Sequence, residues 1–301
     1  MTELRKTAGR WNSDDRQQYF LAGSAAWVDV ASSMHKYLLI AMNELGTDNS
    51  LNLLNNWLNE NKSVIIDSGV YAFANQHAKA NNMSMDAALS LTPEKVDGWD
   101  ILQERYIRVC KQYGEKSWGY FELDQGGKDN KTRLRTMLED EGLRPVPIYH
   151  PINDGWDYFD FLAERYDRIC MGNVVQASRP DRKRLVATAW ERKRKYPNLW
   201  IHLLGLTPNE WANSYIIDSA DSSSWMSTIR WAGLKPKADG KPFSELSKNY
   251  KYLLASDSLG QGGSQKAVFM AAYGATMHQR NWKHHISDWN SLGLNLEPSL
   301  E

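Results

Sequence analysis

The sequence has only two cysteines, Cys110 and Cys170, among its 301 residues. Both lie within apolar stretches, so we expect buried side chains in a reducing compartment, and a cysteine-rich structural zinc site is excluded. The sequence also lacks any run of 18 apolar residues, and its first residues are polar and charged. These absences argue against a membrane-spanning helix and a secretory signal peptide. They predict a cytoplasmic protein with no membrane partner.

An excess of charge of either sign is also missing, because 36 basic residues balance 36 acidic ones. No overall field points to a nucleic acid, so any such binding must depend on local basic patches. The hydrophobic content of 42% and the thirteen tryptophans are sufficient for a substantial core. The length is suited to one α/β barrel with a small appendage.

Short apolar runs alternate with segments of helical periodicity. The apolar runs cover residues 19–25, 37–42, 64–69, 118–124, 145–151, 168–173, 200–206 and 215–221. The amphipathic segments cover residues 51–60, 99–114, 131–143, 158–166 and 182–196. Eight strand-and-helix units predict a (β/α)8 TIM-like barrel of parallel strands. The alternative is an open doubly wound sheet, which usually has fewer strands and a glycine-rich phosphate turn that is absent here.

The barrel is expected over residues 19–225, after a polar extension at 1–18. The interval 26–36 is short for a helix and is the weakest part of this pattern. Residues 226–301 differ in composition and predict a small appendage that ends with a helix over 266–282. Its histidines, His278, His284 and His285, have no carboxylate or cysteine partner at metal-ligand spacing, so no metal site is predicted.

Two aspartates follow apolar runs: Asp67 in "VIIDSG" and Asp218 in "YIIDSADSSSW". In a parallel barrel the carboxyl ends of the strands meet at one rim, so we expect the two carboxylates to act there as acid/base and nucleophile. An aspartate in this position also commonly caps the next helix. Asp67, however, precedes Ser-Gly rather than an evident helix start, and Gly69 permits close approach of a ligand. If Asp218 is not the nucleophile, Asp221 is the first replacement.

Residues 19–225, about two thirds of the sequence, resemble a known family. The strings "FLAGSAAWVDV", "YLLIAMNE", "VIIDSG", "FELDQG", "PIYHP", "CMGN", "IHLLGLTPNEW" and "IIDSADSSSW" resemble, in order, the barrel of the tRNA-guanine transglycosylase superfamily. In that family an aspartate attacks the anomeric carbon and expels guanine, and a 7-deazaguanine then displaces the covalent intermediate. The resemblance implies that Asp218 is the nucleophile and Asp67 the acid/base.

The chain departs from this family in one large feature. The zinc subdomain, with three cysteines and one histidine, is missing. The chain therefore resembles the short, zinc-free phage enzymes that place 7-deazaguanines into DNA, which implies a location in the host cytoplasm. No metal or other cofactor is expected.

The resemblance also implies a base-binding site. Asp124 of "FELDQGG" matches the base-reading aspartate better than Glu122 does, and a carboxylate can accept both donors of the guanine edge. Ser68 and Gly69 belong to the Asp-Ser-Gly motif, although Val70 replaces its second glycine. A solvated carboxylate at a strand end is the alternative for Asp124.

Four further residues complete this expected site. His150 stands where the family has a purine-reading glutamine. Gly172 and Asn173 resemble a segment whose backbone touches the base, and Leu204 is expected to cover the purine. A plain turn and an ordinary core leucine are the alternatives.

The predicted activity is replacement of guanine in DNA by a 7-deazapurine such as preQ0 or a derivative. Five lysines of the appendage are expected to neutralise phosphates: Lys235, Lys237, Lys241, Lys248 and Lys251. Three alternatives stay open: a tRNA acceptor, a non-catalytic nucleic-acid-binding subunit, and a barrel glycosidase with two carboxylates. The oligomeric state, the inserted base and the target sequence are not predicted.

Overall fold

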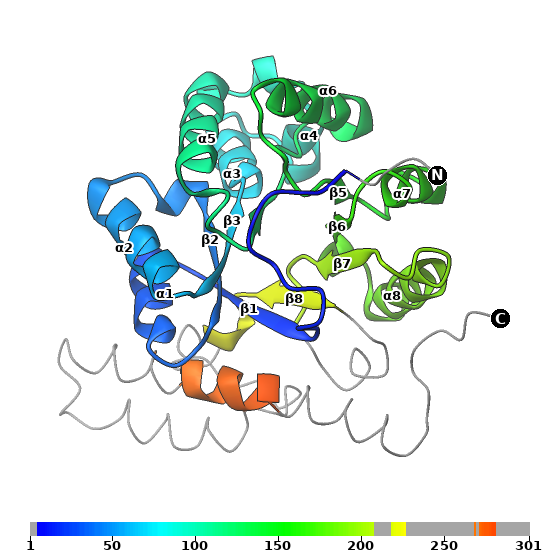
Figure 1. The fold of residues 1–301 in the computed structure, drawn as a ribbon. Helices are drawn as coiled ribbons and strands as arrows, with labels where there is room; N and C mark the ends of the chain where they lie inside the picture. Colours follow the sequence, from blue (N-terminus) through cyan, green and yellow to red (C-terminus); the bar gives the residue numbers. More distant parts are fainter. Residues whose placement is uncertain (1–4, 208–217, 227–267, 269–270, 281–301) are drawn as a thin grey trace, which may run out of the picture.

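The computed structural model describes residues 5–207, 218–226, 268 and 271–280 (Figure 1). Eight strands form one sheet in the order β4-β3-β2-β1-β8-β7-β6-β5, and every pair of neighbours is parallel. The strands are β1 (Gln18–Ala22), β2 (Tyr37–Ala41), β3 (Ser63–Asp67), β4 (Gly119–Tyr120), β5 (Ile148–Tyr149), β6 (Arg168–Met171), β7 (Trp200–Leu203) and β8 (Ser219–Ser222). Every apolar run expected to be a strand overlaps one of them.

The sheet is curled into a TIM-like arrangement, but its strand ladder does not close between β4 and β5. A single isolated parallel bridge, Phe121 to Val146, spans this seam. The Val146 amide donates to the Tyr120 carbonyl at 2.8 Å, and the Glu122 amide donates to the Val146 carbonyl at 3.0 Å. The next amides that face β4 donate to side chains instead of to its backbone: the Ile148 amide to Glu122 Oε1 and the Arg144 amide to the Tyr120 hydroxyl, each at 2.7 Å. The ladder therefore does not extend beyond this bridge. The expected α/β architecture is confirmed as a curled parallel sheet, not as a continuous barrel.

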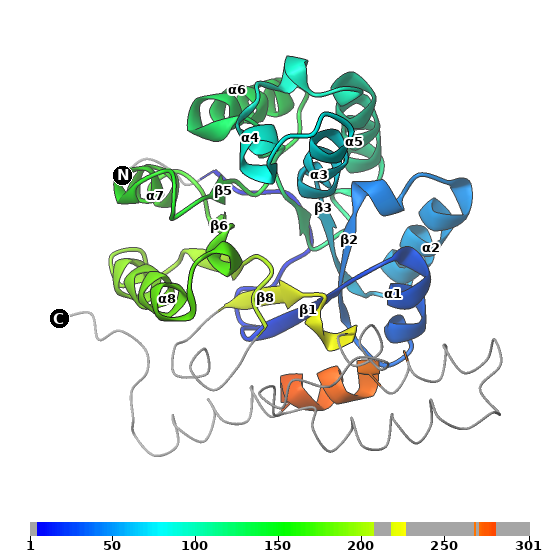
Figure 2. The ribbon, with the colours of Figure 1, turned by 180° about the vertical axis from the view of Figure 1, so that it is seen from behind.

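Helices lie on the outside of the sheet in both views (Figures 1 and 2). They are α1 (Ala25–Ser32), α2 (Asp48–Asn59), α3 (Val70–Ala80), α4 (Met85–Ser90), α5 (Trp99–Tyr113), α6 (Gly127–Asp140), α7 (Trp156–Ala163) and α8 (Arg179–Lys193). The short interval after β1 does hold a helix, α1. Thr47 and Ser50 form a capping box that fixes the start of α2.

Strand alternation divides the core into an inner and an outer layer. The side chains inside the curled sheet include Phe20, Leu39, Ile65, Ile148 and Cys170. The intervening strand residues pack outward against the helices in two larger clusters. Both cysteines are buried and free, as expected.

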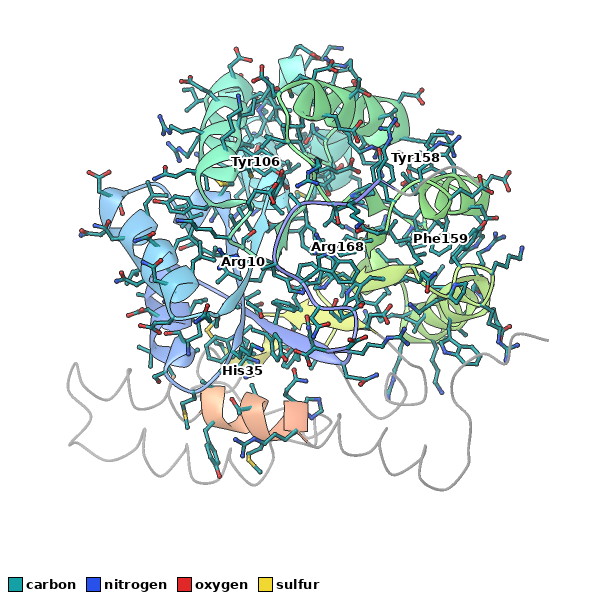
Figure 3. The ribbon with its side chains drawn as sticks, viewed as in Figure 1. Arg10, His35, Tyr106, Tyr158, Phe159 and Arg168 are labelled. Atoms are coloured by element: carbon teal, nitrogen blue, oxygen red, sulfur yellow. The ribbon has the colours of Figure 1, made fainter. Side chains whose placement is uncertain are left out.

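The N-terminal segment crosses the amino ends of the strands (Figure 1). The Ala8 amide donates to the Arg144 carbonyl at 2.8 Å, and the Arg10 amide donates to the Ser117 carbonyl at 2.7 Å. Arg168 is buried at the centre of this end, where its guanidinium donates to Thr7 Oγ1 and to the carbonyls of Ala8 and Trp118 (Figure 3). Residues 5–16 therefore pack as part of the same body as the sheet.

A helix near the C-terminus also packs on the sheet. The structure describes it over residues 271–280, within the expected segment 266–282. The Tyr19 amide donates to Gln279 Oε1 at 2.5 Å, and Ala272 and Ala275 join the outer core cluster of Tyr19. The five lysines of the appendage, with His284 and His285, lie outside the described residues. Within the described part of the chain, no helix is long and apolar enough to span a membrane.

Candidate active site

The carboxyl ends of the strands bring together most of the residues that the sequence singled out. Asp67 ends β3, Asp124 follows β4, His150 follows β5, Gly172 follows β6 and Leu204 follows β7. Because all the strands are parallel, these positions share one rim of the curled sheet. The expected acid/base and base-binding residues are therefore neighbours in three dimensions.

Asp67 is partly buried at this rim, and its pKa is raised to about 7. Burial is the largest cause, followed by the negative charge of Asp124 and then, more weakly, that of Asp221. A hydrogen bond from the Gly69 amide to Oδ2, 3.1 Å long, opposes the rise. At neutral pH both the protonated and the ionised form of Asp67 are populated, as a residue that gives and takes protons requires.

Contrary to expectation, a helix does begin directly after the Asp-Ser-Gly motif. Gly69 is the N-cap residue of α3, with φ of 76°. A Cβ atom on Gly69 would lie 3.3 Å from Met42 N, Met42 Cβ and Asn43 N, in a backbone conformation that other residues rarely adopt. Gly69 therefore allows the tight turn that carries the chain from Asp67 into the helix.

Asp124 contacts both Ser68 and His150. Ser68 Oγ lies 3.4 Å from Asp124 Oδ1, and His150 Nε2 lies 3.4 Å from Asp124 Oδ2. Glu122, the other carboxylate of "FELDQGG", is fully buried and accepts hydrogen bonds of 2.7 Å from Arg135 and from the Ile148 amide. Glu122 therefore has a structural role, whereas Asp124 remains partly exposed at the rim.

Gly172 provides the room that His150 occupies. A Cβ atom on Gly172 would lie 2.8 Å from His150 Cδ2 and 2.9 Å from His150 Nε2. Asn173 adopts a left-handed conformation with φ of 48°, and its side-chain amide donates to Asn153 at 2.6 Å. Leu204 packs against the inner core cluster. Gly172 is thus required for the position of the histidine beside Asp124.

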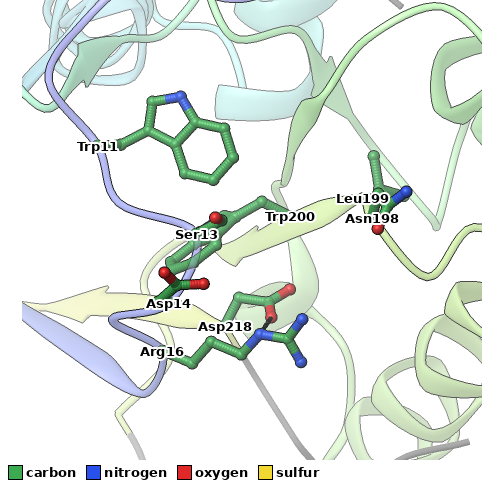
Figure 4. A pocket seen from close by; sticks show the side chains of 8 residues that line it. All are labelled: Trp11, Ser13, Asp14, Arg16, Asn198, Leu199, Trp200 and Asp218. Carbon is green, nitrogen blue, oxygen red and sulfur yellow. Dashed lines mark ion pairs between the residues drawn. The ribbon is translucent and has the colours of Figure 1, made fainter.

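Asp218 does not lie at this rim. It precedes β8, so it lies at the amino end of the sheet, opposite Asp67. Its Oδ2 accepts hydrogen bonds from Lys193 Nζ at 2.7 Å and from the Ile201 amide at 2.8 Å. Asp218 also lines a pocket of about 310 Å³, where Arg16 lies 3.7 Å from its Oδ1 (Figure 4). The expectation that Asp67 and Asp218 meet is wrong, because the described strand begins after Asp218 rather than ending at it.

Asp221 occupies the place that was expected for Asp218. It lies within β8 and is 5% exposed. Its Oδ1 accepts a hydrogen bond of 2.9 Å from the Gly205 amide and lies 3.1 Å from His202 Nε2. Its charge contributes to the raised pKa of Asp67. From the sequence, Asp221 is only the second choice for the nucleophile. His202 is not predicted as a site residue, because in "WIHLLGL" it looks like an ordinary core histidine.

Among the described residues, no group of three histidine, cysteine, aspartate or glutamate side chains is placed to hold a metal ion. Comparison with protein-family models and with curated proteins gives no match to this chain.

Proposed function

We propose that the protein is a base-exchange glycosyltransferase that acts on a nucleotide of a nucleic acid through a covalent aspartyl intermediate. The observation that carries this proposal is the gathering of Asp67, Asp124 and Asp221 at one rim, with the charges of the other two raising the pKa of Asp67. Two carboxylates with different protonation states can divide the roles of nucleophile and acid/base. The third remains available to read a base.

Asp221 is the proposed nucleophile. Its Oδ1 is held by the Gly205 amide and faces His202, while Oδ2 receives no hydrogen bond among the described residues. In the first step, Asp221 Oδ2 forms a bond to C1′ of the nucleotide as the bond from C1′ to N9 of guanine breaks. Protonated Asp67 supplies the proton that the leaving purine takes up.

The second step reverses these roles. N9 of the incoming 7-deazapurine attacks C1′, the bond from C1′ to Asp221 breaks, and ionised Asp67 takes the N9 proton. The exchange needs no oxidant or reductant. The leaving base keeps the electron pair of its bond to C1′, and the entering base supplies an electron pair for the new bond. A pKa of about 7 allows Asp67 to serve in both directions at neutral pH.

Asp124 and His150 are the proposed base-reading residues. The carboxylate of Asp124 can accept both donors of the guanine edge. His150 Nε2 lies 3.4 Å from Asp124 Oδ2 and adds a second polar atom beside the place proposed for the guanine edge. A purine with this edge must leave its stack before it can enter the rim, so the nucleotide is extruded from the nucleic acid.

We propose DNA as the acceptor, with tRNA as the alternative. The support for DNA is the lack of a zinc-binding cysteine set in the sequence, which resembles the short phage enzymes. The lysine-rich segment, which includes Lys235 and Lys251, is the proposed phosphate contact. Replacing its five lysines with glutamine should flatten the salt dependence of binding by about 0.9 in log–log slope per lost contact on duplex DNA.

The decisive test is mass spectrometry of nucleosides after purified protein is incubated with a 7-deazapurine and either duplex DNA or tRNA. We expect the 7-deazanucleoside in DNA, and far less of it with Asp67→Ala, whose turnover should fall about 10²- to 10⁴-fold while DNA binding is kept. Faster exchange on tRNA would reassign the acceptor. A folded protein that binds DNA yet exchanges no base on either substrate would favour a non-catalytic subunit, and cleavage of a sugar substrate would favour a glycosidase.

A further inference from the structure

Four buried side chains form a hydrogen-bonded chain that ends at Asp221. Trp200 Nε1 lies 2.7 Å from Ser219 Oγ, and Ser219 Oγ lies 2.9 Å from His202 Nδ1. His202 Nε2 then lies 3.1 Å from Asp221 Oδ1. Ser219 and His202 are both fully buried, so the chain runs through the interior of the curled sheet.

The chemistry of the first member fixes the direction of every hydrogen bond. An indole nitrogen can only donate, so Ser219 Oγ accepts from Trp200. Among the described residues, the only other partner of the Ser219 hydroxyl is His202 Nδ1, and a buried hydroxyl hydrogen without an acceptor is costly. Ser219 therefore donates to Nδ1. His202 must then carry its hydrogen on Nε2, from which it donates to Asp221.

We propose that His202 is a positioning residue for Asp221, with its Nε2–H tautomer set by Ser219 and Trp200, so that Oδ1 is held in place and Oδ2 faces the substrate. This inference rests on the proposed function, because it assigns a role to the proposed nucleophile. With the Gly205 amide, His202 gives Asp221 Oδ1 two hydrogen-bond donors. A carboxylate held in this way has little freedom to rotate out of line with C1′.

Packing restricts the histidine ring as well. Its centroid lies 5.8 Å from that of Phe20, 6.0 Å from that of Trp118 and 5.1 Å from that of Phe121. These aromatic rings surround the imidazole within the inner core. The ring therefore cannot flip to exchange its two nitrogens without displacing its neighbours.

The same atoms resemble a hydrolytic Ser-His-Asp triad only in composition. Ser219 is 0% exposed and begins β8, so its hydroxyl lies toward the amino end of the sheet, away from the rim. Its oxygen already accepts from Trp200. A substrate at the rim reaches Asp221 rather than Ser219. The group of this hydrogen-bonded series that meets the substrate is therefore the carboxylate of Asp221.

The tautomer can be measured on the unmodified protein by long-range ¹H–¹⁵N NMR of labelled histidine, with His202→Gln used to assign the signal. We expect a neutral ring with its hydrogen on Nε2, and a change to a mixed tautomer in Ser219→Ala. Ser222→Ala is the matched control, because Ser222 is a buried serine of the same strand whose hydroxyl contacts Thr207 and Ser224 instead. A hydrogen on Nδ1 in the unmodified protein, or a doubly protonated ring, would overturn the inference.

A pair of variants tests the role of the donor. The amide nitrogen of glutamine reaches the place of Nε2, whereas that of asparagine reaches only the place of Nδ1. We expect His202→Gln to keep the single-turnover rate of adduct formation within about tenfold, and His202→Asn to lower it about 10- to 100-fold further with KM unchanged. Thermal unfolding confirms that both are folded. If either is not, Ser219→Ala, which should slow adduct formation more than Ser222→Ala does, takes their place.

The outcomes separate the two proposals. Equal rates for His202→Gln and His202→Asn, with an adduct on Asp221 in both, would overturn the role of His202 and leave the proposed function intact. An unmodified protein that forms no adduct with DNA or tRNA would overturn the proposed function and the positioning role with it, whatever tautomer the NMR spectrum reports. A rate difference together with the Nε2–H tautomer supports both.

Discussion

Asp218 and Asp221 are three residues apart in the sequence and lie on opposite faces and toward opposite ends of β8. Asp218 is bound by Lys193 and by the Ile201 amide, between the sheet and α8. Asp221 points into the sheet toward His202 and contributes to the raised pKa of Asp67. An offset of three residues reverses the side of a strand, since side chains alternate with a period of two.

Exchanging each aspartate for asparagine should therefore have opposite effects. Asp221→Asn should abolish the covalent adduct and base exchange with little change in stability, because an amide is a poor nucleophile. Asp218→Asn should retain the adduct but lower the free energy of unfolding by about 3 kcal/mol, because the buried ammonium of Lys193 loses its countercharge. Intact-protein mass spectrometry and urea unfolding measure the two effects. An adduct that survives in Asp221→Asn and disappears in folded Asp218→Asn would restore Asp218 as the nucleophile.

The raised pKa of Asp67 predicts a dependence of stability on pH. The folded protein holds this proton up to about pH 7, whereas the unfolded chain releases it near the ordinary value of 3.8. The stabilisation from protonated Asp67 is complete below the unfolded value and is lost as pH rises through 7.

Asp67→Asn has no ionisable group at this position, so it should not lose stability as pH rises through 7. Relative to the unmodified protein, its free energy of unfolding should rise between pH 4 and pH 8 by about 1 to 2 kcal/mol, since each pKa unit corresponds to about 1.4 kcal/mol and partial exposure reduces the effect. Urea unfolding across this range measures it, with exposed Asp140→Asn as the control. A difference that is constant with pH would show that folding does not raise the pKa of Asp67.

Gly172→Ala should displace His150 from Asp124. The added methyl group would lie 2.8 Å from His150 Cδ2, so the ring must move. We expect KM for the incoming base to rise about tenfold, equivalent to the loss of about 1.4 kcal/mol of binding, with adduct formation retained. Gly46→Ala is the control, because its nearest neighbour would lie at 3.6 Å. An unchanged KM in both variants would remove His150 from base recognition.

Arg168→Lys should destabilise the protein although it keeps the charge. Arg168 donates to Thr7, Ala8 and Trp118 at the amino end of the sheet and lies over the rings of Trp11 and Trp118. A lysine has no planar fork with which to bind all three acceptors. We expect the free energy of unfolding to fall by about 2 to 4 kcal/mol in urea titrations.

Arg133→Lys is the matched control, because its ion pair with Glu94 is exposed and should change stability by less than about 1 kcal/mol. Equal losses for the two variants would show that the N-terminal segment does not hold the sheet together through Arg168. Digestion of the N-terminal segment by protease should also be faster in Arg168→Lys than in Arg133→Lys.

Much of the fold could be predicted from the sequence, because strands and helices leave periodic patterns. The apolar runs located the strands, and helical spacing located α2, α5, α6, α7 and α8. Each of these features depends on residues that are close in the sequence. The seam between β4 and β5 is not local in origin, because the Arg144 and Ile148 amides beside β5 donate to the side chains of Tyr120 and Glu122 rather than to the backbone of β4.

The sequence by itself also placed Asp67, Asp124, His150 and Gly172 at strand ends, because the parallel order brings such ends together. It could not decide whether Asp218 or Asp221 lies at the rim, because both belong to the same short segment, "DSAD". Only the pairing of β8 with β1 and β7 sets which of the two faces inward. The chain through Trp200, Ser219 and His202 was likewise decided by the tertiary structure. Its members come from two neighbouring strands, and the register between those strands sets which side chains touch.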